Sequence, residues 1–267
     1  LTHRIHYLVS EKNNHVDNIL AVTFTNKAAN EMKERLSELL RRPLGRMWVG
    51  TFHSIAHRIL RTHPVEANLS PTFQILDAQD QFRIVKRLMK ENGVDETKFP
   101  IKQVQWFINK QKDEGILPHQ INAEHNYFVK QSAKIFDLYE KYCQANDLVD
   151  FAGLLVKSYE LLKNNQSLLD HYQKKFRHIL VDEFQDTNRI QYQWIKLLHD
   201  QHNHIFCVGD DDQSIYGWRG ARIENIQKME NDFKPIKVIK LEQNYRSTGN
   251  ILSASNTLIA NNPNRLE

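Results

Sequence analysis

Short apolar runs recur along the chain, and each leads directly into a cluster of polar residues. The runs are Ile19 to Phe24, Met47 to Val49, Ile179 to Val181, Ile205 to Val208 and Ile236 to Leu241. Helical patterns follow several of them; after the first, Ala29, Met32 and Leu36 recur at helical spacing. Strands that alternate with helices predict an α/β fold with a parallel sheet flanked by helices on both faces. Ligands bind such sheets beyond the carboxyl ends of the strands, which is where the polar clusters lie.

The alternation stops between about residues 68 and 148, where helical patterns follow one another. In AQDQFRIVKRLMKENG, Phe82, Val85 and Met89 fall on one face of a helix, and Gly93 suits its end. The segments IKQVQWFINKQKDEG and NYFVKQSAKIFDLYEKYCQ are also typical of helices. The sequence therefore predicts an all-helical inserted subdomain. The segment DFAGLLVKSYELLKN, which begins at Asp150, predicts the helix that rejoins the α/β core.

Composition limits the class of protein without identifying it. The chain has 267 residues, of which 40% are hydrophobic and 25% charged, as is ordinary for a soluble globular protein. Its net charge of +4 permits a polyanionic partner without requiring one. Cys143 and Cys207 lack the spacing of a disulfide framework or a metal site, and no apolar run reaches the ~18 residues of a membrane span. These features predict a cytoplasmic protein with no membrane segment, and Leu1 in place of Met predicts a fragment or a processed chain.

Two adjacent carboxylates, Asp182 and Glu183, end the third apolar run. A strand that is apolar on both faces is expected to be buried, and charges beside it are costly unless a positive group meets them. A carboxylate at the end of a buried strand commonly holds Mg²⁺ beside nucleotide phosphates. We therefore interpret Asp182 as a magnesium ligand, acting through water, and Glu183 as the residue that orients or deprotonates an attacking water. The alternative is a helix N-terminus, where acidic residues are favourable without a ligand.

The stretch GDDDQSIYGWRGA follows the fourth apolar run and is poor material for a core or a simple turn. Gln213 could bond a γ-phosphate or the attacking water. Tyr216, Trp218 and Arg219 combine aromatic faces with a guanidinium group, which suits stacking on unpaired bases. The alternative makes Trp218 a core anchor, but the glycines on either side of the Trp–Arg pair favour a loop.

Three further stretches offer groups for phosphates and bases. In NYRST, Tyr245 could stack on a base and Arg246 could meet a phosphate, although a surface Arg commonly pairs with a nearby carboxylate. TFTNKAA and TFHS stand at strand-to-helix junctions, where free N–H groups bind phosphate. The candidate nucleic-acid contacts there are Phe24, Thr25, Asn26, Lys27, Thr51 and His53. Thr51 also suits simple helix capping, and His53 could equally be an interior histidine with its hydrogen bonds satisfied.

Taken in order, these stretches resemble the motifs of superfamily 1 DNA helicases of the UvrD, Rep and PcrA type. AVTFTNKAANEMKERL resembles motif Ia, VGTFHSIAHRIL motif Ib, ILVDEFQDTN the Walker B motif II, VGDDDQSIYGWRGA motif III and LEQNYRST motif IV. The resemblance covers almost the whole chain and implies a RecA-like fold of the P-loop NTPase type. It implies domain 1A at residues 1–67 and 149–242, the helical insert 1B at residues 68–148, and the start of domain 2A at residues 243–267.

The resemblance also implies an ATP-dependent enzyme that moves 3′→5′ on single-stranded DNA and unwinds duplexes at junctions of single and double strands. By this resemblance Asp182 serves Mg²⁺, Glu183 activates water, Tyr245 packs on adenine, and Gln213 and Arg246 sense the γ-phosphate of ATP. The residues implied to line the DNA track are Phe24, Tyr216, Trp218 and Arg219. Other repair or replication proteins are implied as partners, without being specified.

The P-loop pattern G-x-x-x-x-G-K-[ST] is absent, because none of the nine glycines is followed by lysine. The resemblance implies that a P-loop would stand just ahead of Leu1 and that most of a second motor domain would follow Glu267. Without the N–H groups and lysine of that loop, the β- and γ-phosphates have no cradle, so we predict that this chain alone hydrolyses ATP negligibly. Two alternatives remain open: a nucleic-acid-binding module without motor activity, and the helicase part of a helicase–nuclease of the RecB type.

Overall fold

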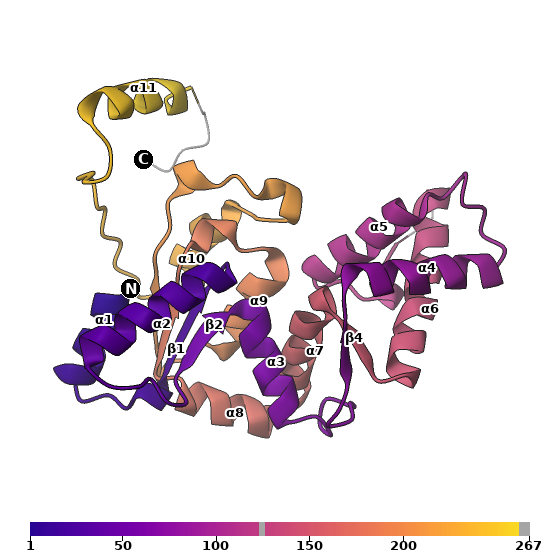
Figure 1. Ribbon diagram of the computed structural model, residues 1–267, viewed down its shortest axis with the longest axis horizontal. Helices are drawn as coiled ribbons and strands as arrows, with labels where there is room; N and C mark the ends of the chain where they lie inside the picture. Colours follow the sequence, from indigo (N-terminus) through magenta and orange to yellow (C-terminus); the bar gives the residue numbers. More distant parts are fainter. Residues whose placement is uncertain (123–125, 262–267) are drawn as a thin grey trace.

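The computed structural model describes residues 1–122 and 126–261 and contains a four-stranded sheet (Figure 1). The strands are β1 (Ile19–Thr23), β2 (Trp48–Thr51), β5 (His178–Val181) and β6 (His204–Cys207). Their order is β2-β1-β5-β6, and every neighbouring pair is parallel. The predicted α/β class with a parallel sheet flanked by helices is confirmed.

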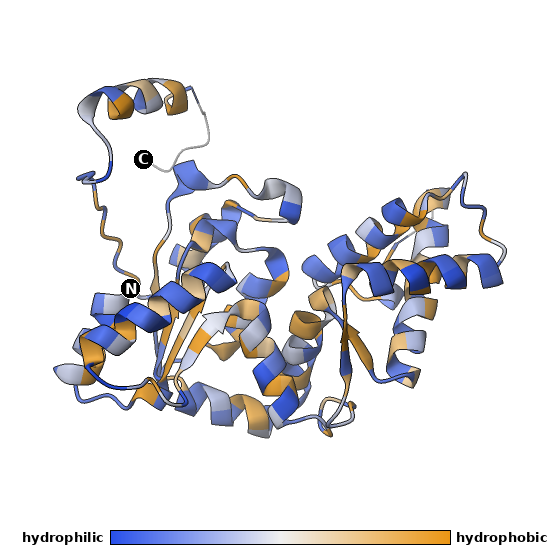
Figure 2. Ribbon diagram, viewed as in Figure 1, coloured by the Kyte–Doolittle hydropathy of each residue, from blue (hydrophilic) through white to orange (hydrophobic). Residues whose placement is uncertain are grey.

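Alternate residues of β1 pack on opposite faces of the sheet. Ile19 and Ala21 join a core with α1 (Thr2–Ser10) and α2 (Asn26–Leu40), whereas Leu20 and Val22 join a larger core on the other face. The helices of that second face are α3 (Phe52–Thr62), α7 (Phe151–Asn164), α8 (Gln166–Lys175) and α9 (Arg189–Leu198). The central strand β1 is buried along its length and apolar from Ile19 to Val22, as expected of a strand covered on both faces (Figure 2), whereas the edge strand β6 is partly exposed.

A helical lobe stands beside this core, at the end of the molecule away from α1 (Figure 1). It contains α4 (Ala78–Glu91), α5 (Ile101–Asp113) and α6 (Tyr127–Ala145), which bury their apolar faces against one another. The prediction that this insertion is entirely helical was wrong, since β3 (Gln74–Leu76) pairs in parallel with β4 (Leu148–Asp150). Periodicity misses β3 because the run is only three residues long and its partner lies far along the chain.

The predicted strand at residues 236–241 was also wrong. This segment has no strand hydrogen bonding, and its apolar side chains face solvent: Val238 is 60% exposed and Leu241 is 89% exposed. The apolar pattern is there, but no neighbouring strand among the described residues meets it. Helix α11 (Gly249–Ile259) follows and buries none of its residues (Figure 1). Within the described chain, no helix is both long and apolar enough to cross a membrane.

Candidate functional site

Polar segments gather where the parallel strands β1, β5 and β6 end. Hydrogen bonding of the sheet continues past the strand ends, because the N–H of Asp182 donates to the carbonyl of Val22 (2.9 Å) and the N–H of Phe184 donates to the carbonyl of Val208 (3.0 Å). The carboxylates after β5 therefore lie between the segment after β1 and the loop after β6. This is the edge of the sheet at which the sequence predicted a ligand site.

Among the described residues, no basic side chain is a cause of the pKa shift of either Asp182 or Asp186 at this edge. Burial, and then the charge of Glu183, raise the pKa of Asp182, and the amino group of Leu1 offsets only part of that rise. Burial and Glu183 also raise the pKa of Asp186 to about 6. One oxygen of Asp186, Oδ1, is buried without a hydrogen-bond partner among the described residues. The negative charge at this edge is thus concentrated and incompletely compensated.

Such an arrangement fits a hydrated Mg²⁺ better than a closed metal site. No group of three or more His, Cys, Asp or Glu within residues 1–122 and 126–261 is placed to hold a metal ion. Mg²⁺ retains several waters and is typically bound by one or two carboxylates together with substrate phosphates. Asp182, half-buried at the strand end, could supply such a carboxylate.

Glu183 is held in an unusual backbone conformation. It is exposed and has φ = +49°, in the left-handed region that costs a non-glycine residue on the order of 1 kcal/mol. Its side chain accepts a hydrogen bond from Nε2 of Gln185 (2.7 Å). The fold thus presents this carboxylate at the sheet edge at a cost in backbone strain.

Gln185 is a residue of this site that the sequence prediction missed. Its side chain is buried, and its Oε1 accepts a hydrogen bond from the N–H of Asp210 (3.1 Å) while its Nε2 binds Glu183. A Cβ on Gly209 would approach Oε1 of Gln185 to 2.9 Å, so glycine allows the close approach of the two loops. Gln185 therefore ties the segment after β5 to the loop after β6. Its position inside DEFQDT was the only signal in the sequence.

Gln213 lies in that second loop, in the short 3₁₀ helix η4 (Asp211–Gln213). It is exposed, and its Nε2 donates to Oδ2 of Asp210 (2.6 Å). Because Asp210 in turn bonds Gln185, the loop that carries Gln213 is connected to Glu183 through two hydrogen bonds. No direct hydrogen bond between Gln213 and Asp182 or Glu183 occurs in the described chain.

Four of the predicted nucleic-acid contacts form one aromatic cluster: Phe24, Tyr216, Trp218 and Arg219. Phe24 stacks on Tyr216 with ring centroids 5.4 Å apart and planes 27° from parallel. The guanidinium carbon of Arg219 lies 5.4 Å from the centroid of Tyr216 and 4.4 Å from that of Trp218. Trp218 is 70% exposed, so the core-anchor alternative is wrong for this residue.

Two of the remaining residues predicted at the strand-to-helix junctions, Thr25 and Thr51, cap helices. Thr25 caps α2 by accepting a hydrogen bond from the N–H of Ala28 (3.1 Å), which leaves Asn26 and Lys27 exposed in its first turn. Thr51 caps α3 in the same way, through the N–H of Ser54 (3.2 Å). Both threonines therefore cap helices, which is the alternative that the sequence already allowed for Thr51.

His53 stacks on Phe151, with ring centroids 4.0 Å apart. Burial lowers the pKa of His53 to about 4, so the imidazole is neutral at pH 7. A contact between His53 and a phosphate would thus be a hydrogen bond rather than an ion pair. Phe151, which is 60% exposed beside it, was not identified from the sequence.

Tyr245 and Arg246 are the two predicted site residues that the described structure does not bring to the sheet edge. Tyr245 is 86% exposed, and the backbone N–H of Arg246 donates a local hydrogen bond to Oδ1 of Asn244 (2.9 Å). They lie in the extended segment before α11, and neither this segment nor α11 packs on the sheet (Figure 1). The expectation that they meet Asp182 and Glu183 is therefore not met within the described residues.

Comparison with known proteins agrees with the arrangement of these motifs. Residues 1–234 match the family model described as the UvrD/REP helicase N-terminal domain. The chain is 53% identical over 266 residues to "DNA helicase II" of Salmonella typhimurium and 53% identical to that of Escherichia coli; all of the chain and 37% of each relative are covered. It is 42% identical over 266 residues to "ATP-dependent DNA helicase PcrA" of Bacillus subtilis, covering 99% of the chain and 36% of that relative. The chain thus spans little more than a third of the length of these relatives.

Proposed function

The chain belongs to the UvrD/REP helicase family through its N-terminal domain, and on this premise we propose that it supplies the catalytic carboxylates and part of the DNA track of an ATP-dependent 3′→5′ DNA helicase. One observation carries the proposal: an uncompensated pair of strand-end carboxylates and an exposed aromatic–guanidinium cluster lie at one edge of the same sheet. The loop after β6 carries both Gln213 and the aromatic cluster, so a shift of this loop would affect hydrolysis and DNA binding together.

In this proposal Asp182 would hold Mg²⁺ through water, and the ion would supply positive charge to the phosphates of ATP. Glu183 accepts the proton of the attacking water, while Gln185 fixes the direction of its carboxylate.

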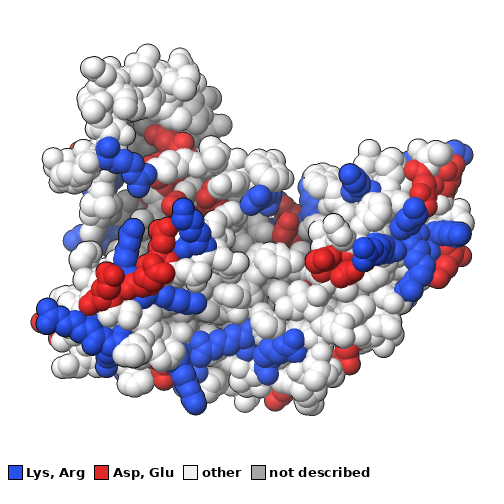
Figure 3. Space-filling view, viewed as in Figure 1, with Lys and Arg blue, Asp and Glu red and all other residues white. Residues whose placement is uncertain are grey.

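Single-stranded DNA would lie over the aromatic cluster. A base that stacks on Trp218 gains ~1–3 kcal/mol, and the guanidinium of Arg219 adds a cation beside the phosphate backbone. Lys27, exposed in the first turn of α2, would meet a phosphate close to Phe24. Figure 3 shows Lys and Arg side chains over α4 of the helical lobe with Asp and Glu beside them, and the excess of basic residues in α4 would favour the duplex side of a junction.

We further propose the domain division implied by the resemblance: 1A at residues 1–67 and 149–242, 1B at residues 68–148, and the start of 2A from residue 243. A hydrophobic core made only of residues between Leu76 and Leu148 supports an independent 1B. Tyr245 and Arg246 would reach adenine and the γ-phosphate only after domain 2A closes on 1A. For this reason the 267-residue chain alone should hydrolyse ATP negligibly. We also propose that the enzyme acts in the cytoplasm, with repair or replication proteins as partners.

The proposal is tested by Glu183→Gln in the complete product of the gene that encodes this chain. A general base typically contributes ~10²–10⁴-fold to a rate, so ATP hydrolysis in saturating single-stranded DNA should fall by about that factor while DNA affinity stays unchanged. Glu66→Gln, an exposed glutamate on the same domain, is the matched control and should hydrolyse ATP at the wild-type rate. Hydrolysis by the Glu183→Gln protein at the wild-type rate would refute the assignment.

A nucleic-acid-binding module without motor activity is the second candidate, because the aromatic cluster is already assembled in this chain. The same assay separates the two. A complete gene product that binds single-stranded DNA through Trp218 but hydrolyses no ATP, with or without DNA, would favour the module.

A further inference from the structure

Consecutive residues at the end of α5 connect the helical lobe to the strand-end site. Residues 112–115, hereafter the lobe–core clip, are Lys112, Asp113, Glu114 and Gly115. Each of them contacts a different part of the molecule. The clip therefore joins segments that are distant in the sequence but adjacent in space.

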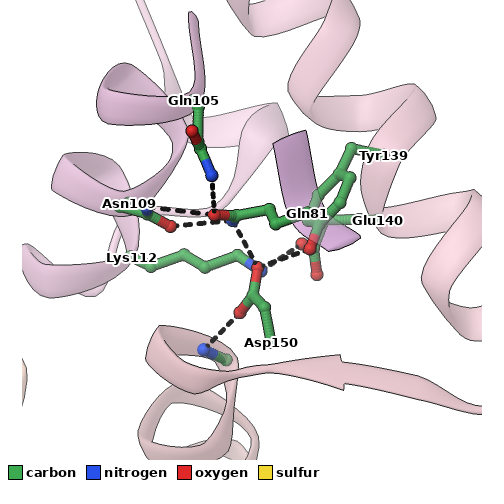
Figure 4. Close-up of polar contacts among 8 residues, drawn as sticks. Gln81, Gln105, Asn109, Lys112, Tyr139, Glu140 and Asp150 are labelled. Carbon is green, nitrogen blue, oxygen red and sulfur yellow. Dashed lines mark hydrogen bonds and ion pairs between the residues drawn. The ribbon is translucent and has the colours of Figure 1, made fainter. Parts of the chain in front are cut away.

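Lys112 anchors the clip in a buried polar hub (Figure 4). Its Nζ lies 2.7 Å from Oδ2 of Asp150 and 2.6 Å from Oε1 of Glu140. Oδ2 of Asp150 also accepts hydrogen bonds from Tyr139 (2.8 Å) and Gln81 (2.9 Å). Burial alone would lower the pKa of Lys112, but these two carboxylates raise it above its ordinary value, so the ammonium stays charged. The end of α5 is thus fixed to α6 and to the start of α7.

Asp113, the next residue, contacts the segment that follows the strand-end carboxylates. Oδ1 of Asp113 accepts a hydrogen bond from Nδ2 of Asn188 (3.0 Å), the last residue of DEFQDTN. Oδ1 of Asn188 simultaneously caps α9 by accepting from the N–H of Gln191 (3.0 Å). Burial, with Glu114 and Asp150 as neighbouring charges, raises the pKa of Asp113 to about 7. The position of Asn188 therefore depends on an acid from the helical lobe.

Glu114 contacts the segment that follows the aromatic cluster. Its Oε2 pairs with Nη2 of Arg222 and lies 3.9 Å from Nη1 of Arg189. The N–H of Arg222 donates to the carbonyl of Thr187 (3.0 Å), and Nδ2 of Asn225 donates to the same carbonyl (2.9 Å). The segment after Trp218 and the segment after Glu183 are thus joined to each other where the lobe meets them.

Gly115 allows the close approach that these contacts need. Its φ is +67°, and a Cβ there would lie 3.1 Å from both Oε1 of Gln193 and Cδ1 of Ile190 on α9. A larger residue would be strained in this backbone conformation and would push the clip away from α9.

We propose that Asp113 and Glu114 are positioning residues that couple the helical lobe to the strand-end site. A shift of the lobe, for instance when it meets DNA, moves α5 and with it Asn188 and Arg222. Asn188 is connected to Glu183 along the DEFQDTN segment, and Arg222 is connected to Trp218 along the GWRGA segment. The inference rests on the proposed function, because its first readout is the hydrolysis of ATP in response to DNA.

The test uses Asn188→Asp and Asp113→Asn, singly and together, in the complete gene product. Asn188→Asp still caps α9 but removes the amide that donates to Asp113; the assay is run above pH 7, where Asp113 is ionised and the two carboxylates repel each other. The double variant exchanges donor and acceptor, since an amide at residue 113 can donate to a carboxylate at residue 188. We expect Asn188→Asp to reduce the stimulation of ATP hydrolysis by single-stranded DNA by ~5–150-fold, the range of typical coupling free energies, with hydrolysis in the absence of DNA unchanged.

The double variant should restore the stimulation, because it re-forms the hydrogen bond between residues 113 and 188, whereas a general structural defect in Asn188→Asp would also lower hydrolysis in the absence of DNA. Failure of the double variant to recover, or full stimulation in Asn188→Asp, would overturn the coupling. A wild-type protein that hydrolyses no ATP would instead refute the proposed function. In that case the affinity for single-stranded DNA decides the inference. Weaker binding by Asn188→Asp with recovery in the double variant would support it. Equal binding by the wild type, Asn188→Asp and the double variant would overturn it.

Discussion

The buried hub around Asp150 and the strand-end carboxylates at Asp182 use the same chemical groups to opposite effect. In the hub, burial alone would raise the pKa of Asp150, but Lys112, Tyr139 and the N–H of Gly153 lower it below its ordinary value. At the strand ends, burial and a like charge raise the pKa of Asp182. A compensated carboxylate stabilises the fold, whereas an uncompensated one is available to a cation that comes with a ligand.

The largest expected effect is on the hub. Lys112→Met leaves Asp150 and Glu140 buried without their cation, and breaking a buried pair in this way costs ~3–5 kcal/mol. The free energy of unfolding, measured by urea denaturation, should fall by about this amount. Lys141→Met is the matched control, because Lys141 pairs with Asp137 on the surface of α6, where an ion pair contributes ~0.3–0.5 kcal/mol. Equal losses in the two variants would mean that Lys112 does not compensate the hub.

A functional loss without a loss of stability is expected at the aromatic cluster. Trp218→Ala removes an exposed stacking face and should weaken binding of single-stranded DNA by ~1–3 kcal/mol, as measured by fluorescence anisotropy of a labelled oligonucleotide. Trp106→Ala is the matched control, because Trp106 is 57% exposed on the helical lobe. Comparable weakening by both substitutions would show that any exposed Trp on this chain binds DNA.

Stability is expected to depend on pH through Asp113, which lies between the hub and the strand-end site. Its pKa is about 7 in the folded chain against an ordinary value of 3.8, so between these pH values the folded chain holds a proton that the unfolded chain has released. Raising the pH through this window therefore lowers the free energy of unfolding. In Asp113→Asn this fall should be smaller, and the variant should be more stable than the wild type at pH 8. Identical pH profiles would exclude a raised pKa at Asp113.

The smallest expected effect belongs to Lys27. If it meets one phosphate, Lys27→Ala should reduce the slope of log affinity against log salt concentration by about 1 and weaken binding similarly for all sequences. Lys141→Ala, a basic residue on the helical lobe, should leave the slope unchanged. A salt titration of oligonucleotide binding distinguishes the two.

The strand-end site could be predicted from sequence because its signals are local. Asp182 and Glu183 follow an apolar run, and Trp218 stands between glycines in a polar loop, so each is visible within a dozen residues. The hub could not be predicted in the same way. Asp150 was recognised only as the start of a helix, because its other partners, Gln81 and Lys112, are 69 and 38 residues away along the chain.

Two further misses have the same physical origin. Gln185 contributes through contacts to Glu183 and Asp210, and apart from its position inside DEFQDT nothing in the sequence distinguishes it from a surface glutamine. The apolar run at residues 236–241 has the pattern of a strand, but a strand forms only where a neighbour supplies hydrogen bonds. Local pattern predicts what a segment can become, and tertiary partners decide whether it does.

The most direct test measures how two substitutions change the free energy of unfolding at pH 7 and compares the signs of the two changes. Asp150→Asn should lower it by ~3–5 kcal/mol, because Lys112 loses its principal buried partner. Asp182→Asn should leave it unchanged or raise it, because the substitution removes a charge that burial and Glu183 already disfavour. A comparable loss of stability in both variants would contradict the distinction between a compensated hub and a carboxylate held ready for a magnesium-bound nucleotide.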